Sequence, residues 1–306
     1  MPELPCYHRL SAVATPTPSR HVIFNADDFG VTRGVNDGII RAHRDGVLSS
    51  ATLMATGAAF DDAVAQAKLN SSLGIGCHLV LVGEKSLSDA AAIPTLVDSR
   101  GNLPSSLPWF VAKVTAGHIR SEDIVTELRA QIQRICAAGI EPTHVDTHKH
   151  THSHPRVMEL VCRVANEFGI NRIRKPIESW SDSWRSTRSG GKRTATQLVA
   201  ASAVRVIGPR FQAIAKNYGM HSPGYFKGLA ATGQIDAATL LFFIDSLETG
   251  TTEVMLHPGI YDLELAQTGT RLRMHRETEM NALIDPRVRA ALLERGVRIM
   301  SYRELH

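Results

Sequence analysis

Short apolar runs alternate with longer amphipathic stretches along most of this chain. Six such runs, bounded by Gly, Pro or polar residues, predict strands at residues 21–26, 50–55, 74–79, 143–148, 171–175 and 252–257. Longer stretches with helical periodicity predict helices at residues 31–46, 60–69, 121–139, 155–169, 195–217 and 236–247. A final pair of helices precedes a last strand at residues 297–300. This alternation predicts a parallel sheet with right-handed crossovers.

About seven strand–helix units in one chain favour a distorted or incomplete (β/α) TIM-like barrel over an open sheet. We expect one domain over residues 20–306. The Pro-containing residues 1–19 lack the apolar core of a signal peptide and are expected to form a flexible tail. Two long loops interrupt the pattern, at 82–108 and at 178–192, and the second contains two tryptophans. Long loops of this kind often bind substrates.

The bulk composition is that of an ordinary globular protein, with 43% hydrophobic and 21% charged residues and a net charge of +4. Basic residues are scattered and not interleaved with aromatics, so nucleic-acid binding is not expected. No run of about 18 apolar residues occurs, so no transmembrane helix is expected. The four cysteines lack CxxC spacing and a secretory context, which predicts reduced thiols in a cytoplasmic protein.

Histidines are concentrated in residues 144–154, where five of the 14 histidines and Asp146 occupy even positions. Alternate residues of an extended strand share a face, so this register predicts that all six side chains point the same way. Imidazole and carboxylate groups bind divalent metals. A straight strand of this length spans about 33 Å, so only two or three of the groups can bind one ion. A solvated His-rich loop is the alternative interpretation.

Other polar residues lie at the ends of predicted strands that are far apart in the chain, namely Asp27, Asp28, His78, Arg174 and His257. Catalytic groups of barrels gather at the carboxyl ends of strands, so we expect these side chains to lie together. One aspartate can bind a metal while its neighbour remains free as a base. The alternatives are a helix N-cap at Asp28 or Thr32, a core position for His78 and a turn position for His257.

Four separated motifs match a known family in order and spacing. The chain resembles the YdjC-like carbohydrate deacetylases in Asn-Ala-Asp-Asp-Phe-Gly (25–30), Gly-Ile-Gly-Cys-His-Leu (74–79), His-Val-Asp-Thr-His-Lys-His (144–150) and Met-Leu-His-Pro-Gly (255–259). The resemblance covers nearly the whole chain after the tail. Two segments are most similar to the hopanoid-biosynthesis-associated branch, namely Cys-His-Leu-Val-Leu-Val (77–82) and His-Lys-His-Thr-His-Ser-His-Pro (148–155).

The resemblance implies a distorted (β/α) barrel that hydrolyses N-acetyl groups of amino sugars. It implies that Asp28, His78 and His148 bind one divalent metal ion. It also implies that Asp27 is the general base and that His257 is the general acid or an oxyanion partner.

Further positions take their expected roles from the same resemblance. Arg174 matches the position that steadies the catalytic aspartate. Asp146 and His150 are interpreted as groups that support the metal ligands or contact the substrate, and His152 and His154 are expected in the turn before the helix at 155. The disaccharide-specific branch tends to have histidine where this chain has lysine, at 149, which favours the hopanoid branch.

The implied cofactor is magnesium by resemblance, although imidazole ligands suit zinc, manganese or cobalt better. The expected substrate is an N-acetylated amino sugar, which the hopanoid branch would take in lipid-linked form, at the inner membrane surface. The resemblance also implies a homodimer. The alternative functions are a chito-oligosaccharide deacetylase, a barrel metallo-phosphoesterase or amidohydrolase, and a non-catalytic sugar- or metal-binding protein.

Overall fold

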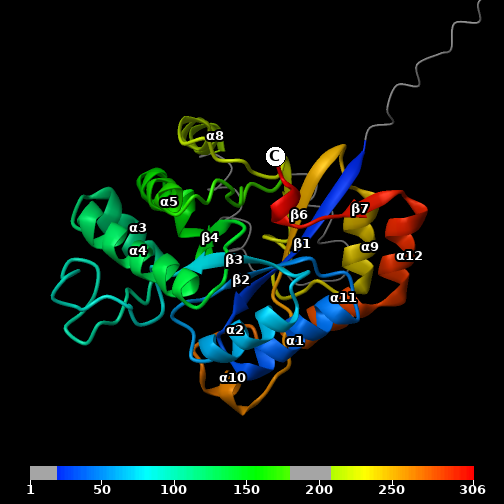
Figure 1. Cartoon of the computed structure of the whole chain (residues 1–306), viewed down its shortest axis with the longest axis horizontal. Coiled ribbons are helices and arrows are strands. Elements are labelled where there is room, and N and C mark those ends of the chain that lie inside the picture. Colours follow the sequence, from blue (N-terminus) through cyan, green and yellow to red (C-terminus); the bar gives the residue numbers. More distant parts are fainter. Residues whose placement is uncertain (1–18, 180–207) are drawn as a thin grey trace, which may run out of the picture.

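A curled parallel sheet lies at the centre of the computed structural model, which describes residues 19–179 and 208–306 (Figure 1). Its strand order is β4-β3-β2-β1-β6-β5, and β7 also pairs with β1. The strands are β1 (Arg20–Phe29), β2 (Ser50–Leu53), β3 (Gly74–Leu79), β4 (Val145–Thr147), β5 (Tyr225–Lys227), β6 (Gly250–Leu256) and β7 (Val297–Ile299). Between β4 and β5 the described residues add only single bridges, Val145–Ile173 and Arg172–His221. The sheet is therefore a half-barrel, consistent with the predicted distorted TIM-like barrel.

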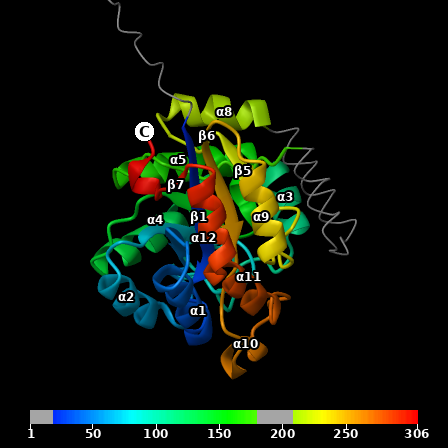
Figure 2. The ribbon, with the colours of Figure 1, turned by 90° about the vertical axis from the view of Figure 1, so that its right-hand side faces the viewer.

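Helices cover the outside of this sheet (Figures 1 and 2). Helix α1 packs against α2 and α11, and α4 packs against α5. The described helices are α1 (Arg33–Arg44), α2 (Phe60–Leu69), α3 (Leu107–Thr115), α4 (Ser121–Ala137), α5 (Pro155–Glu167), α8 (Gly208–Asn217), α9 (Ala237–Asp245), α10 (Leu263–Gln267), α11 (His275–Ile284) and α12 (Pro286–Glu294). Short 3₁₀ segments are η1 (His148–Ser153) and η2 (Tyr302–Glu304). Within the described ranges no helix has the length and apolarity needed to cross a membrane.

Strand β1 organises the site, because it lies inside the sheet and is buried from Val22 to Phe29. Its first half pairs with β7, its second half with β2, and almost its whole length with β6. A strand buried on both faces is expected to be apolar. Asn25, Asp27 and Asp28 break that rule, and buried carboxylates require compensating partners. The polar end of β1 therefore marks the place where such partners must gather.

The N-cap of α1 tests one alternative interpretation from the sequence, in which Asp28 caps this helix. The Thr32 side chain accepts a hydrogen bond from the backbone N–H of Val35 and caps the helix. Asp28 is thus not the N-cap of α1, and its carboxylate is available for other partners.

Several predicted elements differ in detail from the structure. In the segment predicted as a strand at 171–175, only Arg172 and Ile173 form β-bridges. Strand β5 is absent from the predicted elements, because a strand of three residues is too short to give a clear hydrophobic pattern. The loop predicted at 82–108 ends in α3. The tail expected at 1–19 and the tryptophan loop expected at 178–192 lie almost wholly outside the described residues.

Candidate active site

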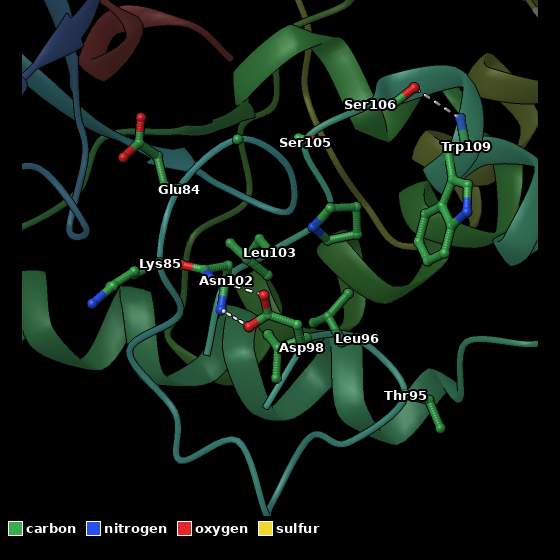
Figure 3. Close-up of a pocket in the computed structure, with 13 residues that line it drawn as sticks. Glu84, Lys85, Thr95, Leu96, Asp98, Asn102, Leu103, Ser105, Ser106 and Trp109 are labelled. Carbon is green, nitrogen blue, oxygen red and sulfur yellow. Dashed lines mark hydrogen bonds between the residues drawn. The ribbon is translucent and has the colours of Figure 1, made fainter. Parts of the chain in front are cut away.

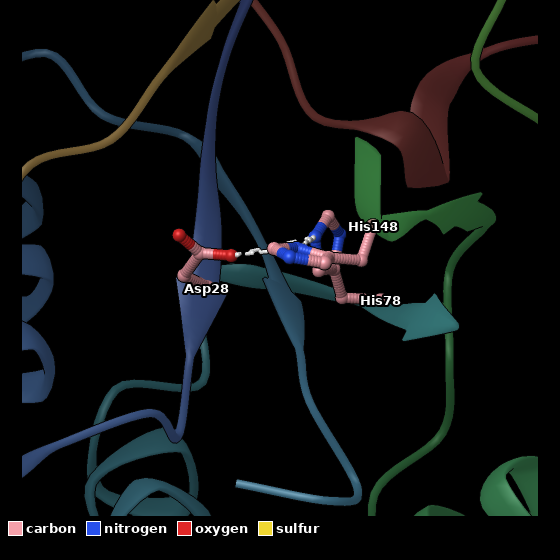
Figure 4. A group of neighbouring side chains, drawn as sticks. All are labelled: Asp28, His78 and His148. Carbon is pink, nitrogen blue, oxygen red and sulfur yellow. Dashed lines mark hydrogen bonds and ion pairs between the residues drawn. The ribbon is translucent and has the colours of Figure 1, made fainter. Parts of the chain in front are cut away.

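Three side chains from three strand ends converge on one point (Figure 4). Asp28 ends β1, His78 lies in β3, and His148 directly follows β4. The Oδ1 atom of Asp28 lies 3.5 Å from Nε2 of His78 and 3.3 Å from Nδ1 of His148, and the two nitrogens are 3.3 Å apart. Atoms that lie about 2.1 Å from a tetrahedral metal ion are about 3.4 Å from one another. The spacing of this triad therefore fits one divalent cation.

The surroundings of Asp28 support the same interpretation. Its Oδ1 atom is buried and accepts no hydrogen bond of ordinary geometry from the described residues. Its backbone adopts φ 69°, a left-handed conformation that is uncommon outside glycine. Burial would raise the pKa of the Asp28 carboxyl, but the charge of Arg276 and the two histidines hold it well below its usual value. Asp28 is thus an ionised carboxylate with one oxygen left for a further cationic partner.

His78 is held from behind by a second carboxylate. Its Nδ1 atom lies 2.7 Å from Oδ1 of Asp146, and its Nε2 atom faces the triad. Burial lowers the pKa of His78, but Asp146 outweighs burial and raises it to about 10. A carboxylate on the far nitrogen orients a metal-binding imidazole. Asp146 therefore contacts His78 on the side away from Asp28 and His148, and its role in supporting a metal ligand stays a prediction.

Arg174 ties three buried carboxylates together. Its Nη1 and Nη2 atoms lie 2.8 and 2.6 Å from the two oxygens of Asp27, and Nη1 lies 2.6 Å from Oδ2 of Asp146. Its Nε atom donates to Glu253 at 2.8 Å. Burial would raise the pKa of Asp27, but the Arg174 charge lowers it. Asp27 is consequently ionised and fixed in orientation.

Another group of metal-type donors, Asp27, His78 and Asp146, also lies close together. Both oxygens of Asp27 and Oδ2 of Asp146 already bond the Arg174 guanidinium, whereas Oδ1 of Asp28 accepts no hydrogen bond of ordinary geometry from the described residues. The triad of Asp28, His78 and His148 is therefore the better metal site.

His257 faces Asp27 from the end of β6. Its Nε2 atom lies 3.9 Å from Oδ2 of Asp27, and its backbone N–H donates to Glu279 at 2.6 Å. Burial lowers the pKa of His257 to about 4, so the resting imidazole is neutral at neutral pH. Together with Asp27, the triad and His150, His257 lines a cavity of about 690 Å³, which is the size of a small-molecule site.

The histidine tract does not continue as a strand beyond Thr147. Residues His148–Ser153 form η1, and Lys149 and His150 both have φ 53°. The prediction that all five histidines share one strand face is therefore wrong, because the chain turns as soon as it reaches the site. The same turn leaves His148 at the triad and His150 on the cavity wall.

The remaining histidines of the tract have structural contacts. The His144 ring stacks on Tyr302 at 3.6 Å. The two ring nitrogens of His152 lie 2.6 Å from Oγ1 of Thr147 and 3.1 Å from the carbonyl oxygen of Arg174. These contacts give His144 and His152 structural roles that involve no metal ion.

Gly76 makes room for the His144 ring. A Cβ at Gly76 would lie 2.4 Å from Cε1 of His144. We expect Gly76→Ala to destabilise the protein by about 1–3 kcal/mol, measured by urea denaturation. Gly224→Ala is the control, because its Cβ would meet nothing closer than 3.6 Å. Equal stability of the two variants would contradict this packing argument.

Two residues at the site, Glu253 and Arg276, were not predicted from the sequence. Glu253 lies within a buried strand and bonds Arg174 and Tyr302, and a charged residue inside an apolar run is a signal that could have found it. Arg276 lies in the charged stretch 271–279, where nothing distinguishes it. Its Nη2 atom donates to Oδ2 of Asp28 at 2.6 Å, and the side chain is 1% exposed. Arg276 thus holds the oxygen of Asp28 that faces away from the triad.

Loss of Arg276 should therefore weaken metal binding. We expect Arg276→Gln to raise the Kd for a divalent metal by about 10–100-fold, as for other partners that orient metal ligands. This Kd is measured by titration calorimetry on metal-free protein. Arg156→Gln is the matched control, since Arg156 bonds Ser121 and the Val114 carbonyl away from the cavity. An unchanged Kd would mean that Arg276 only packs against its neighbours.

Comparison with known proteins finds deacetylases among the similar sequences. The chain is 35% identical over 288 residues to a carbohydrate deacetylase from Geobacillus stearothermophilus, covering 94% of this chain and 98% of the relative. It is 31% identical over 286 residues to a chitooligosaccharide deacetylase from Serratia marcescens, covering 93% and 98%.

A solved structure shares the fold. The crystal structure of a proposed cellobiose-phosphate cleavage protein from Enterococcus faecalis V583 superposes with a TM-score of 0.71 at 24% identity, covering 93% of this chain and 98% of that one. The profile described as YdjC-like protein matches residues 21–294. The chain therefore belongs to the YdjC-like protein family.

Proposed function

We propose that this protein is a metal-dependent hydrolase that removes the N-acetyl group from an amino sugar and releases acetate and a free amine. The observation that carries the proposal is one cavity that brings together the Asp28–His78–His148 triad, the ionised Asp27 and His257. The names of the deacetylase relatives support the same reaction class.

Asp28, His78 and His148 would hold the metal ion, and their spacing and the burial of the Asp28 Oδ1 atom between the two imidazoles fit that role. A divalent cation bound there would polarise the acetyl carbonyl and acidify a water molecule. Family resemblance favours magnesium, while two imidazoles and one carboxylate suit zinc, manganese or cobalt.

Asp27 would act as the general base. Arg174 keeps the carboxylate ionised and fixes its plane, so that Oδ2 faces His257 across the cavity. Asp27 would take a proton from water as the water attacks the acetyl carbon. A positioned proton acceptor of this kind contributes about 10²–10⁴-fold to the rate.

His257 would supply a proton to the departing amine nitrogen. The imidazole is neutral at rest, because its pKa is lowered to about 4. Its Nε2 atom is 3.9 Å from Oδ2 of Asp27, which is beyond a direct hydrogen bond, so one bridging water would pass it the proton that Asp27 has accepted. The proton would then pass from Nε2 to the leaving amine, which restores both groups.

We further propose the hopanoid-linked amino sugar as the substrate, with the protein acting in the cytoplasm at the inner membrane surface. The support is the resemblance of residues 77–82 and 148–155 to that branch and the presence of lysine at position 149. The alternative substrate is a chito-oligosaccharide, which the name of the Serratia relative supports.

The function is tested by measuring acetate release from N-acetylglucosamine conjugates with purified, metal-free protein to which one divalent metal at a time is added. We expect acetate release only with metal, and elemental analysis of protein purified without chelators identifies the native ion. Phosphate-ester hydrolysis measured in parallel is the control. Phosphate release without acetate release would overturn the proposal in favour of a metallo-phosphoesterase.

A further inference from the structure

The C-terminal segment, residues 300–306, carries a tyrosine into the interior of the protein. It follows β7, which pairs with the first residues of β1, whereas Asp27 and Asp28 lie at the other end of that strand (Figure 1). Tyr302 is fully buried, and its ring stacks on His144 with 3.6 Å between the centroids and 5° between the planes. The position and the tilt of the phenol ring are therefore fixed.

Arg172 ties this segment to the stretch of chain that supplies Arg174. Its Nε atom donates to the carbonyl oxygen of Leu305 at 2.7 Å, and its Nη2 atom donates to that of Arg303 at 3.2 Å. Arg172 lies two residues before Arg174. These hydrogen bonds therefore hold the C-terminal segment at a fixed distance from the backbone of Arg174.

Glu253 of β6 connects the tyrosine to the arginine. The Tyr302 hydroxyl donates to Oε2 of Glu253 at 2.5 Å. The Nε and Nη2 atoms of Arg174 both lie 2.8 Å from the other oxygen, Oε1. All three side chains are 0% exposed, and a buried polar network whose members are all bonded is rigid. A continuous row of contacts therefore leads from the C-terminal segment to the arginine that holds Asp27.

The contacts of Glu253 fix the edge of the guanidinium that Asp27 leaves free. A guanidinium has five N–H groups in one plane. The Nη1 and Nη2 atoms of Arg174 contact the two oxygens of Asp27, and Nη1 also contacts Asp146. The remaining contacts, at Nε and Nη2, belong to Glu253. Without them the guanidinium plane would be free to tilt, and the Asp27 carboxylate bonded to it would tilt as well.

The protonation states agree with these donor and acceptor roles. Burial raises the pKa of Glu253, while Arg174 and the Tyr302 hydroxyl lower it, and the balance is a pKa of about 6. Burial and the nearby Glu253 charge raise the pKa of Tyr302 well above its usual value. At neutral pH the tyrosine is therefore the donor, and Glu253 is an ionised acceptor that shares the positive charge of Arg174 with Asp27.

Neither Tyr302 nor Glu253 lines the catalytic cavity or the neighbouring cavity of about 910 Å³ (Figure 3), so neither touches a substrate bound there. We propose that Tyr302 and Glu253 are positioning residues, which act through Arg174 to hold the Asp27 carboxylate in the orientation that accepts a proton from water. This inference rests on the proposed deacetylase function. It makes the C-terminal segment a part of the site, although the segment lies at the opposite end of β1.

The first test measures kcat and KM for acetate release from the methyl glycoside of N-acetylglucosamine by metal-loaded protein. Tyr302→Phe removes the hydroxyl and keeps the stacked ring, and we expect it to lower kcat by about 3–10-fold. Glu253→Gln also removes the charge and should lower kcat by about 10–100-fold. Both should leave KM within about twofold of wild type, because neither residue touches the substrate. Tyr218→Phe is the control, since Tyr218 is partly buried against the core and lines neither cavity.

A double-mutant cycle separates positioning from a general loss of packing. If Tyr302 acts through Asp27, Tyr302→Phe should change the residual rate of Asp27→Asn protein by less than about twofold. A loss of packing would instead lower the rates of both backgrounds by the same factor. Thermal denaturation shows whether each variant is folded at the assay temperature.

NMR of the Arg174 side chain reports its orientation without turnover. A fixed guanidinium rotates slowly and gives separate nitrogen signals for Nη1 and Nη2. We expect these signals to merge in Tyr302→Phe and Glu253→Gln and to stay separate in Tyr218→Phe.

The possible results distinguish the positioning role from the function. Equal effects of Tyr302→Phe in the two backgrounds, or an unchanged kcat, would overturn the positioning role and leave the deacetylase function intact. No acetate release by the wild-type protein, with merged Arg174 signals in both variants, would overturn the function and leave the positioning of Arg174. Arg174 signals that stay separate in both variants would overturn the positioning role at any rate of acetate release.

Discussion

Replacing Asp27 by asparagine should lower kcat for acetate release by about 10²–10⁴-fold while the protein still binds its metal. Asparagine has nearly the same shape but cannot accept a proton from water. Arg174 would retain Asp146 and Glu253 as partners, so the buried guanidinium would not be left alone. Asp27 is also separate from the triad whose atoms lie within reach of one ion. Steady-state acetate release and metal titration on the same preparation measure both quantities.

The matched control is Asp45→Asn, which removes an exposed carboxylate that pairs with Arg41 on α1. We expect wild-type kcat from it, because surface ion pairs contribute little to stability. Thermal denaturation of the Asp27→Asn protein shows whether a lower kcat reflects loss of the base or unfolding of the variant. Full acetate release by a folded Asp27→Asn variant would remove Asp27 from the role of base.

The second large effect concerns the metal. Replacing His148 by alanine should weaken divalent-metal binding by more than about 100-fold, since loss of a ligand costs more than loss of its supporting partner. A chelator should abolish acetate release from the wild-type protein, and added metal should restore it. His148 is a suitable target because its side chain is 21% exposed, so truncating it to alanine creates only a small buried cavity. Titration calorimetry and elemental analysis give the affinity and the stoichiometry.

His154→Ala is the matched control within the same tract. His154 contacts the Thr115 hydroxyl at 3.1 Å and lies outside the triad, so this variant should keep one metal per chain. If His148→Ala kept the wild-type affinity and His154→Ala lost it, the metal would lie elsewhere in the tract and the triad would be wrong.

The sequence indicated the chemistry of the site better than its shape. The strand-end positions predicted that Asp28 and His78 lie at one edge of the sheet, and the resemblance to the YdjC-like family singled out Asp28, His78 and His148 as one set. The structure brings these three together. Their catalytic and metal-binding roles remain predictions, as do those of Asp27 and His257.

Three features could not be read from residue patterns. The turn at Lys149 and His150 uses left-handed backbone at non-glycine residues, which local propensity disfavours. The partnership of Arg276 with Asp28 joins residues that are 248 positions apart. The sheet also stops at a half-barrel because residues 171–175 form only bridges, and a strand-like pattern does not reveal how many partners a segment finds.

The two buried arginines set the charge balance of the site. Four carboxylates bond them, namely Asp27, Asp146 and Glu253 at Arg174 and Asp28 at Arg276. Four carboxylates against two guanidiniums leave two negative charges, which the protonated His78 imidazole offsets in part in the metal-free protein, because, despite its burial, the carboxylates around it raise its pKa to about 10. A divalent cation bound there would offset the negative charge that remains, and it would stabilise the folded chain by an amount that rises with the logarithm of its free concentration. Stabilities of variants are therefore comparable only at one fixed free-metal concentration.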